Sequence, residues 1–370
     1  MGFKFDKNNS FEYLFFDAWN GCSEEYLSNF NNLIMQVTAN KTVNDSSWQK
    51  VIMKYNKADI RKSVWQLVNS IVPYIGLWFL MIYSLQVSYL LTIFLAVIAA
   101  GLLVRVFIIF HYCGHGSFFH TKKVNDLVGI ICGILVFTPY HMWHKQHASH
   151  HATTVNLDKR GVGDIWTMTV NEYLSSSKGK RFIYRTFRNP FILFTFGPLF
   201  LFFIKNRFAK KDLTSNEKWN VYFTNLVLLA IATGMSLLIG LKAYLLIQLP
   251  IIYLGHLIGL WLFYIQHQFE DVAWEDSSTW DYKTAAISGS SFLKLPLILQ
   301  WFTGNIGFHH IHHLSPRIPN YNLERCQNEN DLFSDVKPIT FFTTFKAMRL
   351  SLWDETSRQL VRFRKVRVNT

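Results

Sequence analysis

Three five-residue windows of the sequence gather most of its histidines. They read HYCGH from position 111, HASHH from 147 and HHIHH from 309, and they hold nine of the chain's 14 histidines. On a helix, residues at i, i+3 and i+4 project from one face. The histidines with this spacing are His111, His115, His147, His150, His151, His309, His312 and His313. Three such helices converging would present eight imidazoles to one volume, enough for two metal ions.

Imidazole ligands limit the metals that the site could bind, but they do not identify one metal. Imidazole suits iron, zinc, copper and nickel, whereas a structural zinc site usually includes a cysteine thiolate. The cysteines are scattered, with no C-x-x-C pair, at Cys22, Cys113, Cys132 and Cys326. This usage is typical of reduced thiols in a cytoplasmic setting. We therefore expect a metal site with all-nitrogen ligation.

Other histidines lie outside this spacing, and two of them could serve the same site. His267 follows the last predicted membrane span, where the chain returns beside the windows, and is a candidate ninth ligand. His256 lies within that span, and ionisable groups inside a membrane are functional candidates by default. The remaining histidines are predicted to be interfacial or to hydrogen-bond a ligand, and they are His120, His141, His144 and His310.

Acidic residues near the windows are candidates for orienting the imidazoles. A ligating imidazole normally donates its other N–H to a carboxylate or a carbonyl. The candidate carboxylates are Asp126, Asp164, Glu270 and Asp271. For each of them, a solvated or helix-capping residue is the alternative interpretation.

The elements that must position these residues are predicted to be membrane helices. Half of the residues are hydrophobic, 16% are charged and the mean hydropathy is +0.13, which favours a membrane protein over a soluble one. A span needs about 20 apolar residues, and the runs that qualify are 64–85, 87–110, 221–240 and 243–265. Very short connections join the first two runs and the last two. Each pair is therefore predicted to form a helical hairpin.

Two shorter apolar runs, 127–139 and 191–204, are predicted to be interfacial or re-entrant. Each is shorter than the roughly 20 residues of a span. A further span after the second window would also place the third window across the membrane from the other two. The basic residues gather on the side of the windows, with at most Lys242 at the hairpin tips. The positive-inside rule therefore predicts that the windows and both termini are cytoplasmic.

The sequence thus predicts an all-α integral membrane protein, with four transmembrane helices as two hairpins and a cytoplasmic helical cap that holds the three windows. Its predicted parts are a cytoplasmic extension 1–62, a membrane domain 63–265 with a cytoplasmic insert 111–218, and a cytoplasmic region 266–370. The formal charge of +13 suits an anionic membrane surface or an acidic protein partner. No nucleic-acid-binding motif accompanies it, so a nucleic acid partner is not expected.

The windows and their flanking residues resemble a known family. HYCGHGSFF, HKQHASHHATTVNLDKRGVGDIWT, YIQHQFE and NIGFHHIHHLSPRIPNY are similar to the membrane fatty acid desaturases, and more narrowly to the Bacillus-type acyl-lipid (delta-5 phospholipid) desaturases. The resemblance runs from about Val64 to Asp354. The chain departs from the family pattern at Tyr112, where the first window commonly has Asp. It departs again at Phe263, where some acyl-CoA relatives have Asn.

The resemblance implies a reaction and its requirements. It implies two iron ions, O2 as co-substrate, and electrons from a small acidic carrier of the ferredoxin or flavodoxin type. The expected reaction is the oxygen-dependent introduction of a cis double bond into acyl chains of phospholipids in the cell membrane. In the family, the histidines of the windows bind the iron, and His267 matches an extra histidine that follows the last span in related desaturases.

Two other functions fit part of the pattern. An acyl hydroxylase or related oxygenase would use the same arrangement of histidines. A histidine-rich metal transporter or sensor would also bind metal, but it should carry polar residues along its spans. The predicted spans show little of that kind beyond His256, which favours an enzyme.

Overall fold

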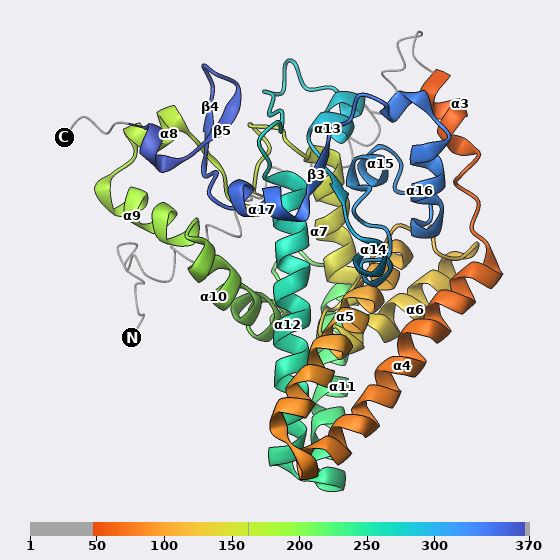
Figure 1. The fold of residues 1–370 in the computed structure, drawn as a ribbon. Coiled ribbons are helices and arrows are strands. Elements are labelled where there is room, and N and C mark those ends of the chain that lie inside the picture. Colours follow the sequence, from red (N-terminus) through yellow and green to blue (C-terminus); the bar gives the residue numbers. More distant parts are fainter. Residues whose placement is uncertain (1–46, 162, 367–370) are drawn as a thin grey trace.

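Four long apolar helices dominate the structure. The computed structural model describes residues 47–161 and 163–366, so most of the predicted extension 1–62 lies outside the described residues. The long helices are α4 (Ile60–Val87), α5 (Tyr89–Gly114), α11 (Ser215–Ile239) and α12 (Leu241–His267), and each is long and apolar enough to cross a membrane. They gather at one end of the molecule (Figure 1). The prediction of a mostly helical protein with four long apolar helices is confirmed.

Two of the long helices, α4 and α11, begin several residues earlier than hydropathy predicts, each at a polar cap. The side chain of Asp59 accepts hydrogen bonds from the backbone N–H groups of Arg61 and Lys62 at the start of α4. Thr214 and Glu217 form a reciprocal capping box at the start of α11. Gly240, with φ of 85°, separates α11 from α12. A positive φ strains most side chains, so glycine suits this tight connection.

The helix α5 is the centre of the bundle. Its most apolar stretch is 61% buried inside the protein, against 6% for α11, so α11 is the helix that faces outward most. α5 packs against α4, α6 (Lys122–Leu135), α7 (Tyr140–Thr153) and α12. Small residues permit this close packing: a Cβ at Gly255 of α12 would lie 2.9 Å from Leu103 of α5.

The two shorter apolar runs form bent helix pairs. α6 and α7 meet at 102°, while α9 (Lys178–Phe187) and the stretch that begins with α10 (Pro190–Phe203) meet at 78°. Neither pair is a straight helix of spanning length, although each could count as one broken span. Their interfacial or re-entrant position stays a prediction.

Short elements cover the end of the bundle that carries the histidine windows (Figure 1). The helices are α3 (Ser47–Met53), α8 (Val170–Ser175), α13 (Tyr282–Ser288), α14 (Leu297–Phe302), α15 (His309–Leu314), α16 (Asn320–Asn328) and α17 (Phe341–Ala347), with 3-10 turns η1 (Lys205–Arg207), η2 (Asp331–Phe333) and η3 (Phe363–Lys365). Five short strands, which the sequence did not predict, are β1 (Met168–Thr169), β2 (Phe292–Lys294), β3 (Pro338–Thr340), β4 (Leu352–Asp354) and β5 (Gln359–Val361). They pair in the orders β1-β4-β5 and β2-β3, which joins the C-terminal region to earlier parts of the chain.

A buried arginine ties four parts of the chain together. Arg188, 2% exposed, donates hydrogen bonds from one terminal nitrogen to Tyr264 Oη, Gln268 Oε1 and the Leu350 carbonyl, at 3.0, 2.9 and 2.6 Å. Its other terminal nitrogen donates to the Trp166 carbonyl at 3.3 Å. The guanidinium therefore joins the end of α9 to the end of α12, the loop after α7 and the C-terminal region.

Replacing this arginine should destabilise the fold. In Arg188→Met, buried acceptors lose their donor, and we expect a loss of at least about 3 kcal/mol in the free energy of unfolding. Thermal unfolding in detergent measures the change. Arg349→Met, at an exposed position, is the matched control and should unfold close to the wild-type temperature. Equal unfolding temperatures for both variants would contradict the proposed tie.

Candidate metal centre

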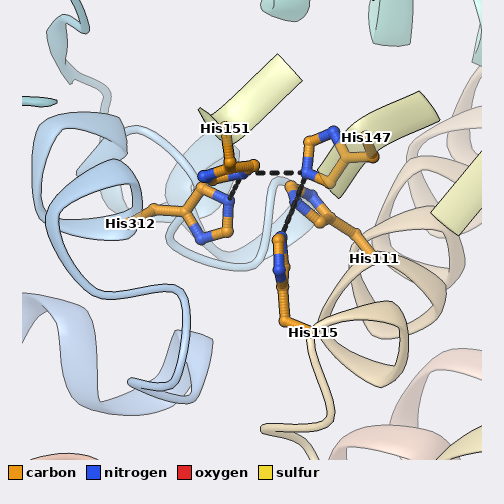
Figure 2. A group of neighbouring side chains, drawn as sticks. All are labelled: His111, His115, His147, His151 and His312. Atoms are coloured by element: carbon orange, nitrogen blue, oxygen red, sulfur yellow. Dashed lines mark hydrogen bonds between the residues drawn. The ribbon is translucent and has the colours of Figure 1, made fainter. Parts of the chain in front are cut away.

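Five imidazoles converge in a first group. A ligand nitrogen from each of them lies within 4.8 Å of the others, and the residues are His111, His115, His147, His151 and His312. His111 lies near the end of α5 and His115 caps it, the middle two lie on α7, and His312 lies on α15. Figure 2 shows the rings turned toward one another from these three segments.

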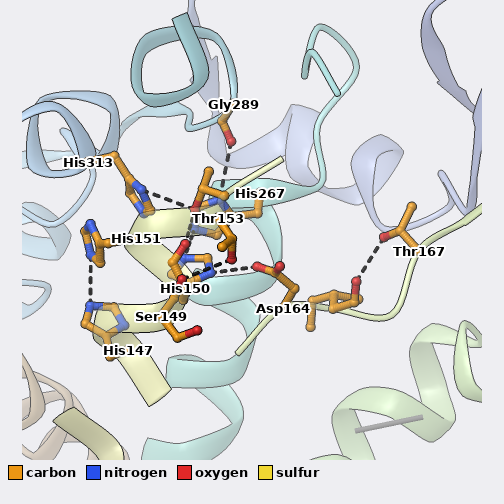
Figure 3. Close-up of polar contacts among 12 residues, drawn as sticks. His147, Ser149, His150, His151, Thr153, Asp164, Thr167, His267, Gly289 and His313 are labelled. Atoms are coloured by element: carbon orange, nitrogen blue, oxygen red, sulfur yellow. Dashed lines mark hydrogen bonds and ion pairs between the residues drawn. The ribbon is translucent and has the colours of Figure 1, made fainter. Parts of the chain in front are cut away.

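Four more imidazoles form a second group beside the first. His150, His267 and His313 bring ligand nitrogens within 4.8 Å of one another. His309 Nε2 joins them at 3.0 Å from His267 Nε2 and 3.1 Å from His313 Nε2. Figure 3 shows part of this group around His150. Eight predicted histidines and His267 are thus brought together.

The H-x-x-H-H windows lie between the two groups and serve both. On α7, His147 and His151 belong to the first group and His150 to the second; on α15, His312 belongs to the first and His313 to the second. The rings of His151 and His313 stack with their centroids 4.0 Å apart, at the boundary. The H-x-x-H-H spacing on one helix face therefore directs neighbouring imidazoles to both groups.

The contacts inside the first group fit a cation better than hydrogen bonds. His147 Nε2 lies 2.7 Å from His111 Nε2 and 3.0 Å from the Nε2 atoms of His115 and His151. A neutral imidazole nitrogen carries either one proton or one lone pair, so it cannot satisfy three such neighbours at once. A metal ion that accepts several lone pairs can do so.

Burial favours the neutral form of the ligand imidazoles in the third window. Burial, and then the neighbouring imidazoles, lower the pKa of His309, His312 and His313 well below the usual range for histidine. A low pKa leaves the ring uncharged at neutral pH, and the neutral ring is the form that binds metal. The electrostatics of the site therefore favour ligation.

His150 and His267 of the second group each have a hydrogen-bond partner for Nδ1, the ring nitrogen that faces away from the group. Asp164 Oδ1 lies 2.6 Å from His150 Nδ1, and the Gly289 carbonyl oxygen lies 3.3 Å from His267 Nδ1 (Figure 3). A proton on Nδ1 leaves the lone pair on Nε2, which points into the group. Gly163 brings Asp164 to α7: it has φ of 74°, and a Cβ there would lie 3.0 Å from His150 Cβ. A larger residue would push this loop away.

The other predicted carboxylates lie elsewhere. Asp126 accepts from Lys122 and from Tyr140 Oη, while Glu270 and Asp271 are exposed. Among these four candidates, Asp164 is the one that the structure places against an imidazole. Loop geometry rather than distance along the chain makes the difference, since Asp126 is closer in sequence to a window.

The remaining histidines have other surroundings. His310 lies in the third window and is buried, but its Nε2 lies 2.9 Å from Gln327 Oε1. His256 Nε2 lies 3.0 Å from the Val136 carbonyl, and its ring stacks on Phe202. His120 and His144 are exposed.

Two positions that depart from the family pattern contact the groups. The Phe263 ring lies 5.3 and 5.4 Å from the rings of His150 and His267. The Tyr112 ring lies 5.1 Å from that of His312, and its buried hydroxyl has no hydrogen-bond partner among the described residues. Neither packing contact is visible in the sequence.

A large cavity reaches both groups. Its volume is about 1150 Å³, and its lining includes His111, His147, His150 and His309. Apolar residues of α5, α10 and α12, such as Phe107, form much of the wall, and lysines lie along another part of the lining. The imidazoles therefore face a space large enough for a long apolar molecule.

The fold and the site define a membrane protein with a histidine cluster able to bind metal. The family model described as fatty acid desaturase matches residues 87–342. A fatty acid desaturase of Bacillus subtilis (strain 168) is 48% identical over 318 residues, covering 86% of this chain and 90% of the relative. The chain belongs to the fatty acid desaturase family and is an oxidoreductase. The resemblance seen in the sequence is confirmed.

More distant relatives cover less of the chain. A Delta(12) fatty acid dehydrogenase of Crepis alpina is 27% identical and covers 80% of this chain and 83% of its own length. An sn-1 acyl-lipid omega-3 desaturase (ferredoxin) of Nostoc sp. (strain 36) is 27% identical and covers 67% of this chain and 69% of its own length. Proteins of the same family therefore differ in where and on what they act.

Replacing Asp164 should lower the metal content of the protein, whereas replacing Asp126 should not. Asp164→Asn removes the anionic partner of His150, and we expect affinity for one metal ion to fall by about 10- to 100-fold. Asp126→Asn should leave metal content at the wild-type level. Elemental analysis of the purified variants at graded free metal concentrations measures both. Equal metal loss in the two variants would refute the role of Asp164.

Proposed function

We propose that this protein introduces a cis double bond into acyl chains of membrane lipids, using O2 and two iron ions held by the nine histidines of the two groups. The observation that carries the proposal is the cavity, whose lining joins an apolar wall to imidazoles of both groups. One ion would lie among the first group. The other would lie among His150, His267, His309 and His313.

Iron at this site would supply the activation of O2 that removing hydrogen from an unactivated methylene requires. Overall, –CH2–CH2– plus O2, two electrons and two protons gives –CH=CH– and two waters. The protein's own residues bind and orient. Phe107, Leu260 and other apolar residues of the lining would hold the chain and exclude water. Asp164 and the Gly289 carbonyl would keep two rings turned inward.

The relatives and the charge of the chain support the proposed substrate and electron donor. The Nostoc relative is described as acting on an acyl lipid with ferredoxin, which supports a lipid-bound acyl chain and a ferredoxin-type carrier for this chain. A flavodoxin-type carrier has the same acidic character. The formal charge of +13 favours association with an acidic partner, since opposite charges steer encounter.

We also propose the cell membrane as the location, with both termini and both histidine groups on the cytoplasmic side. The cytoplasmic parts would be 1–62, 111–218 and 266–370, as the distribution of basic residues predicts. The membrane part would contain α4, α5, α11 and α12.

Neighbouring histidines of the third window provide the test. His312→Asn removes an imidazole of the first group, so we expect desaturation to fall by more than about 100-fold. His310→Asn changes the adjacent buried ring, which bonds Gln327 instead, and should retain activity within severalfold. Mass spectrometry of lipids from an expression host with a competent electron carrier measures both.

The same measurement tests the reaction. Loss of two hydrogens from acyl chains is the expected product, whereas gain of an oxygen would show hydroxylation. Unchanged lipids with the wild-type protein present in the membrane would refute the proposed function. Immunoblots of both variants control for protein level.

A further inference from the structure

Lysines surround part of the cavity that reaches the histidine groups. Lys159, Lys205, Lys210 and Lys211, here called the lysine rim, all line it. They come from two segments: the loop after α7, and the stretch that begins at η1 after α10. Burial lowers the pKa of Lys205 to about 6, so Lys159, Lys210 and Lys211 supply most of the positive charge that these two segments bring to the cavity at neutral pH.

The acidic charge near the rim is smaller than the charge of the lysines that line the cavity. Asp212 also lines the cavity, but its carboxylate lies 3.7 Å from Lys145 Nζ. Lys145 Nζ lies 3.6 Å from a carboxylate oxygen of Glu217 as well. One lysine cannot balance both carboxylates, but among the described residues the lining holds one acidic residue, Asp212, against four lysines besides Lys205, so its formal charge is positive.

Exposed apolar side chains flank the rim. Phe203 and Ile204 precede Lys205 directly, and Phe208 follows it; they are 37%, 47% and 66% exposed. The helix α10 leads into this stretch and leans across the outside of the bundle, with its C-terminal part against α12 (Figure 1). Apolar residues mixed with lysine at a surface are typical of a membrane interface, where lipid headgroups lie.

The cavity thus has two chemically different parts. Its inner wall is apolar and reaches the imidazoles. Its rim is cationic and adjoins exposed apolar side chains of the protein surface. A molecule that matches both parts has a long apolar chain and an anionic head. Holding the head at a fixed place would also position the chain, since remote binding contacts orient a reacting group.

We propose that the lysine rim is a phosphate-binding site, and that its ligand is the phosphate of a membrane glycerophospholipid whose acyl chain enters the cavity. The inference rests on the proposed function, because it takes the cavity as the site of the acyl chain. A soluble acyl-CoA carries phosphates too. The exposed apolar flank favours the lipid, which can enter sideways from the bilayer.

Binding to purified, metal-loaded protein in detergent tests the site. The probes are dipalmitoyl phosphatidylglycerol, dipalmitoylglycerol with the same chains and no phosphate, palmitoyl-CoA, and inorganic phosphate as competitor. Each interfacial lysine contributes about fivefold in affinity for an anionic lipid. The triple variant Lys159→Gln, Lys210→Gln, Lys211→Gln should therefore bind phosphatidylglycerol about 100-fold more weakly, with unchanged affinity for dipalmitoylglycerol.

Two matched variants control the experiment. The triple variant Lys178→Gln, Lys180→Gln, Lys365→Gln changes the same charge at exposed positions outside the cavity lining, and should bind like the wild type. Lys211→Glu alone changes one exposed rim residue, so it reports on the rim even if the triple variant fails to fold. It should weaken phosphatidylglycerol binding and leave dipalmitoylglycerol binding unchanged.

Each other outcome overturns the inference. Equal losses in the rim and control triples would show a general charge effect, and tighter binding of palmitoyl-CoA would assign the rim to a soluble thioester. Competition by inorganic phosphate alone, with no preference of the wild type for phosphatidylglycerol over dipalmitoylglycerol, would exclude the lipid. If the wild type desaturates lipids but rim variants bind phosphatidylglycerol normally, the rim proposal fails and the proposed function stands. If the wild-type protein does not desaturate lipids, the proposed function itself is refuted.

Discussion

Nine imidazoles must stay neutral while they crowd into one buried volume, and the rest of the structure depends on this constraint. A charged ring would repel its neighbours, and burial lowers the pKa of rings such as His312 and His313 enough to prevent that charge. Neutral rings can turn several lone pairs toward one point. The crowding that would be costly for charged groups is therefore favourable for a metal site.

The fold meets this constraint by bringing the ends of long helices under a set of short ones. α5 and α12 carry His111 and His267 to the end of the bundle, where α7 and α15 meet them. The short helices could not hold their position alone, because isolated helices of this length are marginal. Buried ties such as Arg188, and the parallel pairing of β1 with β4, fix the segments that cover the site.

Local patterns carried the predictions that hold. Hydropathy over about 20 residues reveals a long apolar helix, and i, i+3, i+4 spacing reveals a shared helix face, so α4, α5, α11 and α12 were found. Contacts between distant segments leave no such pattern. The choice of Asp164 over Asp126 depends on a turn at Gly163 that brings the carboxylate to His150. The pairs β1-β4 and β2-β3 likewise join strands more than 40 residues apart in the sequence, where no local period exists.

The two groups are chemically different, and this follows from their neighbours. The first has five imidazoles, and among the described residues no carboxylate hydrogen-bonds to their rings. The second has four, and one of them, His150, is hydrogen-bonded to Asp164. A carboxylate behind an imidazole raises the basicity of that ligand, so a metal ion in the second group would be the more electron-rich of the two. Phe263 places an apolar ring against His150 and His267 in this group. Two sites built from one residue type can therefore take unequal parts in one reaction.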